Sequence, residues 1–230
     1  MINDVVVACD FSSESKTLNF LSKFKEKKPF VKIGLELFCG EGPNIIRKIK
    51  SGGNKIFLDL KLHDIPNTVK KTMMKISELN VDMVTVHAGG GAKMISAAKE
   101  GLSFKENSAL LMVVTVLTSV SQKILNKELL FDRTLEEVAE KYAVIAQENG
   151  ADGVICSCSE VPSIKNICKK SFLTVTPGIR YKAANDDQIR IFTPQEAKKF
   201  GSDFIVVGRP ITASNDPVGE YKKILKDFLG

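Results

Sequence analysis

The sequence predicts an α/β fold, a (β/α)8 TIM barrel, and two patterns lead to this prediction. Eight short runs of apolar and β-branched residues predict strands. Helical patterns, with apolar residues three and four apart, lie between these runs. Strands that are apolar on both faces and alternate with helices are typical of a parallel sheet covered by helices, and eight such units favour closure into a barrel.

The predicted elements follow one another regularly along the chain. The strands are predicted at residues 5–9, 30–34, 55–60, 83–87, 109–116, 153–156, 172–176 and 204–208. The helices are predicted at residues 14–25, 44–50, 68–79, 92–99, 134–149, 160–169, 195–200 and 218–228. The segment SVSQKILNKELLF after the fifth strand has the weakest helical pattern. No composition break divides the chain, so residues 1–230 are predicted to form one barrel domain.

An open, doubly wound sheet is the structural alternative to a barrel. Such sheets commonly bind nucleotides through a G-x-G-x-x-G or GK[ST] motif directly after a strand. Neither motif follows any of the predicted strands, which favours the barrel.

The composition limits the classes of protein to which the chain can belong. Its 230 residues are 43% hydrophobic, which is enough for a core, and no run of eighteen apolar residues predicts a membrane helix. The N-terminus, MINDVVVACDFSSE, has neither the basic region nor the apolar stretch of a secretory signal. We therefore expect a cytoplasmic protein with no membrane partner.

Five cysteines are scattered through the chain, at Cys9, Cys39, Cys156, Cys158 and Cys168. They lack the paired spacing of a structural zinc site and fit the reduced thiols of a cytosolic protein. The closely spaced Cys156 and Cys158 leave a metal or redox role open, although the sequence offers no further ligands beside them.

The net charge of +6 raises the question of a nucleic-acid partner. The 33 basic residues are interleaved with 27 acidic ones, and the chain has no tryptophan and only three tyrosines for base stacking. A lysine-rich solvated surface explains the charge, so we expect no nucleic-acid partner. A small anionic substrate is compatible with it.

Polar and charged residues follow the C-terminal ends of most predicted strands. In a (β/α)8 barrel these ends meet at the face that carries the active site. The residues there are Asp10, Lys32, Asp59, Lys61, His87, Thr118, Pro177, Arg180, Gly208 and Arg209. A barrel that needed only stability would have little reason to end strand after strand in this way.

The stretch FLDLKLHDIPNT, residues 57–68, carries the pattern D-x-K-x-x-D, formed by Asp59, Lys61 and Asp64. Side chains two apart on a strand share a face, so Asp59 and Lys61 are predicted to project together at the barrel mouth, with Asp64 in the loop beyond. A structural ion-pair cluster is the alternative interpretation. Asp10 and Lys32 reach the same mouth, which favours a functional site.

Together with this stretch, several separated motifs resemble those of orotidine 5'-phosphate decarboxylases: VACD with Asp10, VKIG with Lys32, TVHAGGG, VLTS, TPGIR, DDQIR and VVGRPIT. They span nearly the whole chain in order, whereas D-x-K-x-x-D alone would indicate only the wider suprafamily. The resemblance implies that the protein converts orotidine 5'-monophosphate to UMP and CO2, the last step of de novo UMP synthesis. It also implies a homodimer with shared active sites and no cofactor or metal.

The resemblance further assigns roles to individual residues. The implied catalytic residues form an alternating charge array of Lys32, Asp59, Lys61 and Asp64, in which Lys61 is the proton donor and Asp64 comes from the other subunit. Asp59 is implied to lie beside the departing carboxylate. The implied substrate-binding residues are Asp10 and Lys32 at the ribose, Thr118 at the pyrimidine, Ile65 and Thr68 at the border of the partner's site, and Pro177, Arg180, Gln188, Gly208 and Arg209 toward the phosphate.

The phosphate end also has a physical basis in the residues themselves. Loops after strands seven and eight are the usual phosphate site of this barrel. Gly208 lets its backbone N–H approach an anion, and Arg209 adds a charged fork. Arg180 and Gln188 bracket the segment YKAANDD, which is polar enough to be a lid over the phosphate or else a plain surface loop.

The expected chemistry explains why a lysine stands at position 61. Loss of CO2 from C6 of an orotate ring leaves a carbanion with little delocalisation, which a fixed ammonium stabilises and then protonates. Lysine carries a transferable proton, whereas arginine hardly releases one. Repulsion between Asp59 and the substrate carboxylate ranks second.

Two other functions are kept as alternatives. A magnesium-dependent decarboxylase of a keto-sugar phosphate shares D-x-K-x-x-D but resembles an acidic metal site where this chain has Lys32, so a metal-free enzyme is predicted. A non-catalytic barrel that binds nucleotides or RNA would show salt-sensitive nucleic-acid binding and no release of CO2.

Two further features are predicted to be structural. The segment HAGGGAKM could cradle a phosphate, but three glycines more simply ease a tight turn before a helix. His63 and His87 lack the further ligands of a zinc site and are predicted to be hydrogen-bonded structural residues rather than catalytic bases.

Overall fold

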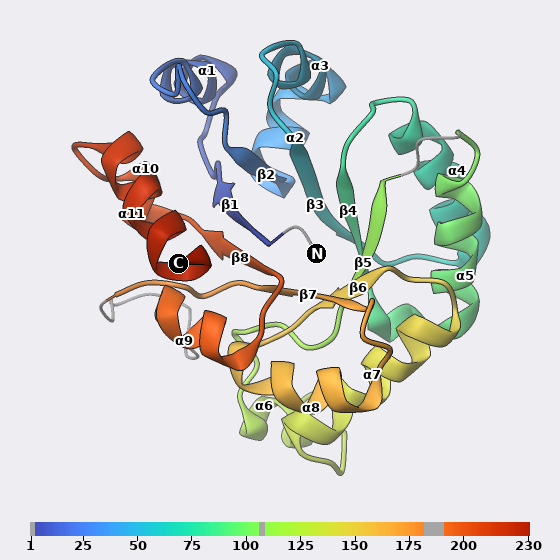
Figure 1. Ribbon diagram of the computed structural model, residues 1–230. Coiled ribbons are helices and arrows are strands. Elements are labelled where there is room, and N and C mark those ends of the chain that lie inside the picture. The colour runs from blue at the N-terminus through green and yellow to red at the C-terminus, as the bar shows by residue number, and fades with distance from the viewer. Residues whose placement is uncertain (1–2, 106–108, 182–190) are drawn as a thin grey trace.

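In the computed structural model, which describes residues 3–105, 109–181 and 191–230, eight strands form a closed parallel barrel ringed by helices (Figure 1). The strands are β1 (Asp4–Ala8), β2 (Phe30–Gly34), β3 (Ile56–Leu62), β4 (Met83–His87), β5 (Leu110–Val114), β6 (Gly153–Ile155), β7 (Leu173–Thr176) and β8 (Phe204–Val207). Pairing of β8 with β1, for example of Ile205 with Val5, closes the barrel. The predicted (β/α)8 TIM barrel is confirmed.

Helices lie between the strands and form the outer layer. They are α1 (Glu14–Ser22), α2 (Leu35–Glu41), α3 (Pro43–Ser51), α4 (Pro66–Ser77), α5 (Gly91–Leu102), α6 (Gln122–Lys127), α7 (Leu135–Glu148), α8 (Val161–Ile167), α9 (Pro194–Phe200), α10 (Arg209–Thr212) and α11 (Pro217–Leu229), with short 3-10 turns η1 (Ala88–Gly90) and η2 (Cys158–Glu160). The weak pattern after the fifth strand forms α6. Within the described ranges, no helix has both the length and the apolar character needed to cross a membrane.

Two short helices, α2 and α10, were not predicted from the sequence. Each begins within a residue or two of a strand's last residue, at Leu35 after β2 and at Arg209 after β8. These residues lie just beyond the predicted strands and belong to no predicted element, because so short a helix gives little helical signal. The strand ends that carry the site are therefore followed by tighter turns than the sequence indicates.

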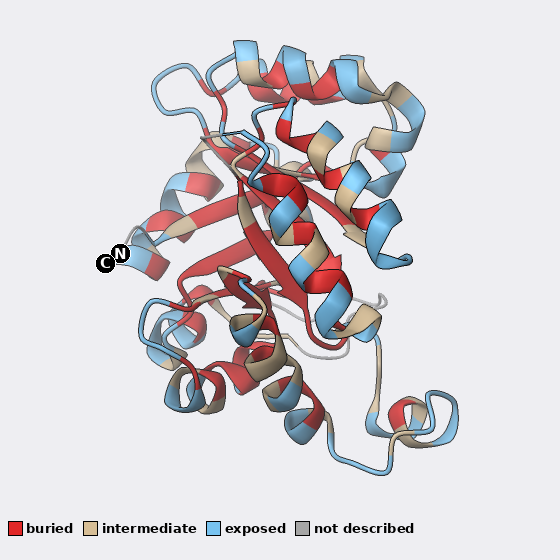
Figure 2. Ribbon diagram, turned by 90° about the vertical axis from the view of Figure 1, so that its right-hand side faces the viewer, coloured by how far each residue is buried: buried red, intermediate tan, exposed pale blue. Residues whose placement is uncertain are grey.

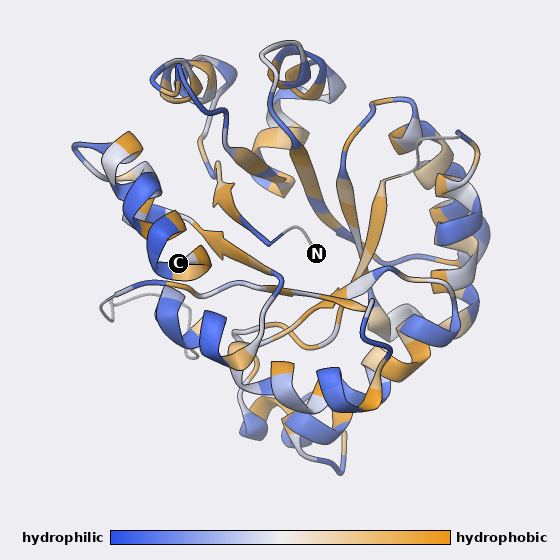
Figure 3. Cartoon of the chain, viewed as in Figure 1, coloured by the Kyte–Doolittle hydropathy of each residue, from blue (hydrophilic) through white to orange (hydrophobic). Residues whose placement is uncertain are grey.

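The strands are buried and largely apolar (Figures 2 and 3), and successive strand residues belong to two different apolar clusters. The barrel interior holds Val6, Ala8, Phe30, Phe57, Met83, Met112, Val114, Ile155, Val175, Phe204 and Val206. The intervening residues, such as Val5 and Val7 on β1, belong to the larger cluster that includes the helical residues Phe20 and Tyr221. Both faces of the sheet are thus buried, as parallel strands covered by helices require.

Strand β3 departs from regular pairing near its C-terminal end. Its register with β4 passes from Leu58 opposite Val84 to Leu62 opposite Val86, so β3 holds two more residues than β4 over this interval. Lys61 lies in the irregular stretch and has a left-handed φ of 48°. Bulges of this kind bend a strand and re-aim its side chains, and here the bulge falls at the predicted site residues.

Three aspartates at the N-terminal end of the barrel share one arrangement. Asp82, Asp152 and Asp203 each precede a strand, and each carboxylate accepts hydrogen bonds from one lysine and one backbone N–H. The donors are Lys50 (2.7 Å) and the N–H of Ile56 (2.7 Å) to Asp82, Lys99 (2.7 Å) and the N–H of Leu111 (2.8 Å) to Asp152, and Lys165 (2.6 Å) and the N–H of Thr174 (2.7 Å) to Asp203. Each carboxylate therefore ties a helix to the starts of two strands, at the barrel end where residues serve stability.

The most buried of these aspartates should contribute strongly to stability. The side chain of Asp203 is 7% exposed, so Asp203→Ala leaves Lys165 and the N–H of Thr174 without their shared acceptor. We expect a loss of about 3 kcal/mol in the free energy of unfolding, measured by urea denaturation. Lys75→Ala is the control, because the Lys75–Glu78 pair lies on the surface and is worth at most about 1 kcal/mol. Equal losses for the two variants would contradict a structural role for Asp203.

Candidate active site

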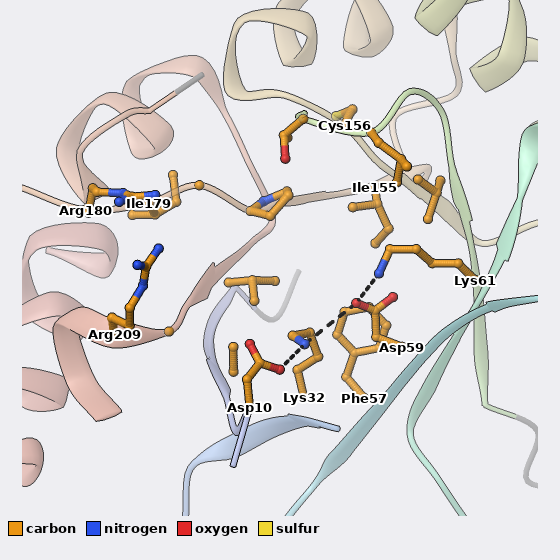
Figure 4. A pocket seen from close by; sticks show the side chains of 18 of the residues that line it. Asp10, Lys32, Phe57, Asp59, Lys61, Ile155, Cys156, Ile179, Arg180 and Arg209 are labelled. Carbon is orange, nitrogen blue, oxygen red and sulfur yellow. Dashed lines mark hydrogen bonds and ion pairs between the residues drawn. The ribbon is translucent and has the colours of Figure 1, made fainter. Parts of the chain in front are cut away.

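A cavity of about 430 Å³ opens at the C-terminal ends of the barrel strands (Figure 4). Its charged lining residues are Asp10, Lys32, Asp59, Lys61, Arg180 and Arg209. Its uncharged lining residues are Ala8, Phe57, Val114, Val116, Leu117, Thr118, Ile155, Cys156, Pro177, Gly178, Ile179, Val206, Gly208, Pro210 and Thr212. Residues separated by up to two hundred positions in the sequence thus meet in one cavity, as the barrel topology predicts.

Four charged side chains form a continuous chain of ion pairs along one side of the cavity (Figure 4). The ammonium of Lys32 lies 2.9 Å from Oδ1 of Asp10 and 3.9 Å from Oδ2 of Asp59. The ammonium of Lys61 donates a hydrogen bond of 2.7 Å to the same Oδ2 of Asp59. Asp59 therefore lies between two cations, and signs alternate from Asp10 through Lys32 and Asp59 to Lys61.

The four groups differ in their contact with solvent. The side chains of Asp59 and Lys32 are 10% and 12% exposed, whereas that of Lys61 is 34% exposed and that of Asp10 is 60% exposed. Buried charges are retained in proteins when they are paired, and the two inner groups satisfy this condition. The more open Lys61 leaves its ammonium accessible to a molecule in the cavity.

Two guanidinium groups lie at the opposite side of the cavity (Figure 4). Arg180 follows β7 and is 8% exposed, and Arg209 is the first residue of α10 after β8. A Cβ added at Gly208 would lie 3.6 Å from the Cβ of Ala8, an ordinary contact, so packing does not require glycine at this position. With no side chain at Gly208, the part of the cavity beside Arg209 is left open to a ligand.

Hydrogen bonds hold the backbone around Arg180 and the side chain of the residue after it. The N–H of Arg180 donates to the carbonyl of Phe192 (2.9 Å), and the N–H of Phe192 donates to the carbonyl of Gly178 (3.2 Å). The hydroxyl of the next residue, Tyr181, donates to Asp227 on α11. These bonds hold Arg180 at the cavity edge. Gln188 and the segment proposed from the sequence as a lid lie outside the described residues, apart from Tyr181.

The family model described as "Orotidine 5'-phosphate decarboxylase / HUMPS family" matches residues 3–224 of this chain. The chain belongs to this family. The family and the enzyme class predicted from the sequence are therefore confirmed, because the relatives named below are decarboxylases of the same name over nearly their full length.

One relative in the decarboxylase family is "Orotidine 5'-phosphate decarboxylase" of Geobacillus sp. (strain WCH70), which is 48% identical over 235 residues, covering 100% of this chain and 98% of the relative. The crystal structure of orotidine 5'-phosphate decarboxylase from Lactobacillus acidophilus is similar with a TM-score of 0.89 at 42% identity, covering 99% of this chain and 100% of that one. That of the Pyrococcus horikoshii OT3 enzyme has a TM-score of 0.78 at 25% identity, covering 98% and 99%.

Three of the decarboxylase residues predicted from the sequence lie away from the cavity. Asp64, Ile65 and Thr68 are exposed, and none of them lines it. The carboxylate of Asp64 accepts a hydrogen bond from the N–H of Ile65, and Ile65 is 68% exposed. This segment begins three residues after Lys61, and its three predicted site residues are exposed to solvent rather than turned to the ion pairs.

Sequence reasoning missed the apolar wall of this cavity. Its members are Phe57, Val114, Val116, Leu117 and Ile155. Each sits in a strand or just beyond one, where apolar residues indicate core and give no signal of a ligand. The signal that could have identified Phe57 was its position, because it precedes Asp59 by two residues and therefore lies on the same inward face of the strand. Sequence reasoning also missed Thr85, a buried residue of β4 that contacts both Asp59 and Lys61.

Two of the buried cysteines, Cys9 and Cys158, show no sign of reactive chemistry. Burial raises the pKa of the Cys9 thiol to about 12, and burial together with the charge of Glu196 raises the pKa of Cys158 to about 12. Both are therefore neutral thiols near pH 7, whereas nucleophiles and metal ligands are thiolates. Within the described ranges, no group of three His, Cys, Asp or Glu residues could hold a metal ion.

The glycine-rich segment forms a tight turn rather than part of the cavity. Ala88–Gly90 make the turn η1, and Gly91, at φ 76°, begins α5. A Cβ at Gly90 would lie 2.1 Å from Sδ of Met94, so a larger residue there would have to displace the buried side chain of Met94. The glycines do not line the cavity, in agreement with the turn expected from the sequence.

The two histidines pack against each other beside this turn. The rings of His63 and His87 stack with centroids 5.5 Å apart, and Nδ1 of His87 accepts a hydrogen bond of 3.0 Å from the N–H of Gly89. His87 is thus hydrogen-bonded, as predicted, while His63 contributes a ring contact. Burial, followed by the charges of His63 and Lys61, lowers the pKa of His87 below its ordinary value.

This lowered pKa predicts a contribution of His87 to stability that depends on pH. The unfolded chain binds a proton at His87 more readily than the folded protein, so acidification below about pH 6.5 favours unfolding until the folded pKa is passed. We expect the free energy of unfolding to fall between pH 7.5 and pH 5.5, and to fall less in His87→Asn, whose Oδ1 can still accept from Gly89. An identical pH dependence in the two proteins, measured by urea denaturation, would contradict this role.

Proposed function

We propose that this protein decarboxylates orotidine 5'-monophosphate to UMP and CO2 through a carbanion at C6 that Lys61 stabilises and protonates. The observation that carries the proposal is the ammonium of Lys61, which is held 2.7 Å from Asp59 yet open to a cavity whose other side bears two guanidinium groups. Family membership supports the reaction class. The substrate has an anionic phosphate at one end and a reacting ring at the other, which fits this division of charges.

Lys61 is suited to both steps of the proposed reaction. Its ammonium is fixed by Asp59 before the reaction, so little reorganisation is needed as negative charge develops at C6. The same ammonium then transfers a proton to that carbon. Because Lys61 is a lysine, the proton can be transferred, which an arginine would hardly allow.

The remaining charged residues are assigned to binding. Asp10 and Lys32 form an ion pair of 2.9 Å at the cavity wall and are proposed to hold the ribose hydroxyls. Thr118 lines the cavity and is proposed to contact the pyrimidine, and Pro177, also in the lining, is proposed to lie toward the phosphate. Arg180, Arg209 and the backbone at Gly208 are proposed to bind the phosphate, with Gln188 as a further contact.

We further propose that the reaction needs neither metal nor cofactor. The position that would hold a divalent ion in the keto-sugar-phosphate alternative carries Lys32, whose ammonium lies 3.9 Å from Asp59. A cation already paired with that carboxylate opposes the binding of Mg²⁺ there. The alternative of an RNA-binding barrel has less support, because the cavity is compact and the described lining lacks a row of aromatic residues for base stacking.

The proposed setting is the cytoplasm, where the reaction would complete de novo UMP synthesis. The five cysteines, all within the described residues, form no disulfide, which fits a reducing compartment. The proposed assembly is a homodimer in which Asp64, Ile65 and Thr68 border the partner's cavity. Exposure of all three residues beside Lys61, and of the apolar Ile65 in particular, supports this arrangement.

The central test follows the loss of orotate absorbance with purified protein, orotidine 5'-monophosphate and no added metal. We expect turnover that EDTA leaves unchanged. Lys61→Ala should lower kcat by at least about a thousandfold, because it removes both the charge partner and the proton donor. Activity that disappears with EDTA and returns with Mg²⁺ would favour the keto-sugar-phosphate alternative, and near-normal turnover of Lys61→Ala would overturn the assigned mechanism.

A second test concerns the binding energy supplied by the phosphate, which does not react. Arg209→Ala should lower kcat/KM for the nucleotide by about a hundredfold, the effect of removing the charged partner of the phosphate from a bound complex. The slow reaction of the phosphate-free nucleoside should hardly change, because it never uses Arg209. Equal losses on the two substrates would contradict a phosphate-binding role.

A third test separates Asp64 from its neighbours in the sequence. Lys61→Ala and Asp64→Ala should each be nearly inactive as homodimers. When the two are unfolded together and refolded, half of the dimers are hybrids, and each hybrid has one site with both residues intact. Activity should therefore recover to roughly a quarter of the wild-type value. A mixture that stays inactive, although native mass spectrometry detects the hybrids, would place Asp64 in its own chain's site or outside any site.

A further inference from the structure

Thr85 is a buried hydroxyl at the centre of the ion-pair chain that the proposed mechanism does not use. It lies on β4 next to the irregular part of β3 and is 0% exposed. Its Oγ1 accepts a hydrogen bond of 2.8 Å from the N–H of Lys61 and donates one of 3.0 Å to Oδ1 of Asp59. A single side chain thus joins the backbone of Lys61 to the carboxylate that holds its ammonium.

The direction of these two bonds is fixed by chemistry. The N–H of Lys61 can only donate, so it occupies a lone pair of the hydroxyl oxygen. The hydroxyl proton is then free for Asp59, whose ionised carboxylate can only accept. Thr85 therefore uses both its acceptor and its one donor on the two residues of the ion pair, and an apolar side chain such as valine could replace neither bond.

The bond to the N–H of Lys61 compensates for the bulge. Lys61 has a φ of 48°, which is unfavourable for a residue with a Cβ and persists only where surrounding contacts hold it. The bulge interrupts the regular pairing of β3 with β4, and the N–H of Lys61 finds Oγ1 of Thr85 as its acceptor. The backbone from which the ammonium projects is thereby held.

The bond to Asp59 decides which oxygen faces the ammonium groups. Oδ1 is occupied by Thr85, while Oδ2 lies 2.7 Å from the ammonium of Lys61 and 3.9 Å from that of Lys32. Without the hydroxyl, the carboxylate could rotate and take Lys61 with it. Thr85 has no place in the cavity lining, so its effect on a bound molecule must pass through these two residues.

We propose that Thr85 is a positioning residue that fixes the ammonium of Lys61 for reaction, an inference that rests on the proposed decarboxylation. Loss of its hydroxyl should lower kcat, because a misplaced ammonium stabilises the developing charge less well. It should leave KM for orotidine 5'-monophosphate nearly unchanged, because the groups assigned to the phosphate and ribose are not in contact with Thr85.

The test compares steady-state kinetics of Thr85→Val, Thr85→Ser and Thr115→Val. Valine keeps the shape of threonine and removes the hydroxyl, and we expect a kcat roughly ten- to a hundredfold lower, the fold-change of one hydrogen bond to a charged group. KM should stay within about twofold of wild type, and serine should restore most of kcat. Thr115 is the matched control, since its buried hydroxyl also bonds a strand end, the carbonyl of Ile155, without touching the ion pairs.

Each outcome decides the proposal. A wild-type kcat in Thr85→Val, or an equal loss in Thr115→Val, would overturn it, as would a failure of Thr85→Ser to recover activity. If Thr85→Val does not fold, as judged by circular dichroism, Thr85→Cys replaces it, because a thiol is a weak donor and should give an intermediate kcat. A wild-type protein that does not consume the nucleotide would refute the proposed function itself, which distinguishes that failure from a failure of the role of Thr85.

Discussion

The site depends on one buried carboxylate. Asp59 as a whole residue is 8% exposed. It interacts with the ammonium groups of Lys61 and Lys32 through one oxygen and with Thr85 through the other. Two ammonium groups near one another repel, and a lone carboxylate in a barrel interior is costly to desolvate. When the three charges are held together, the carboxylate reduces the repulsion between the ammonium groups, and the ammonium groups compensate for the desolvation of the carboxylate. The alternating charges are therefore a condition for burying any of them at the barrel mouth.

The closed barrel makes this arrangement possible. Asp10 follows β1, Lys32 lies on β2, and Asp59 and Lys61 lie on β3, so three neighbouring parallel strands end at the same edge. The guanidinium groups follow β7 and β8, which closure brings to the other side of the same mouth. An open sheet with this strand order would leave these two groups of charges at opposite edges. Closure thus creates a cavity with separate ends for a reacting group and for an anion.

The sequence predicted the parts of the structure that depend on local pattern. Strand positions follow from apolar runs, and the shared face of Asp59 and Lys61 follows from the two-residue period of a strand. What it did not predict depends on pairing between strands. The left-handed φ of Lys61 arises from a register shift against β4, and the role of Thr85 arises from a contact across 24 residues of sequence. The aspartates at the N-terminal barrel end pair over comparable separations, and no local spacing marks them.

The balance of charge in the cavity bears on how the proposed reaction proceeds. Among the described lining residues, Asp10 and Asp59 balance Lys32 and Lys61, so Arg180 and Arg209 leave an excess of positive charge. A phosphate monoester carries roughly −1.5 to −2 at neutral pH, which this excess matches. In the proposed binding mode, the carboxylate of the substrate would add a negative charge near Asp59, beyond the charges that the cavity balances. In the proposed reaction, departure of CO2 would move that charge onto the ring beside Lys61, and proton transfer from Lys61 would then neutralise the carbanion and the ammonium together. The net charge of the complex would stay the same, but the negative charge would move from beside Asp59 to beside Lys61, and this gain during the reaction is the kind of difference in binding that accelerates it.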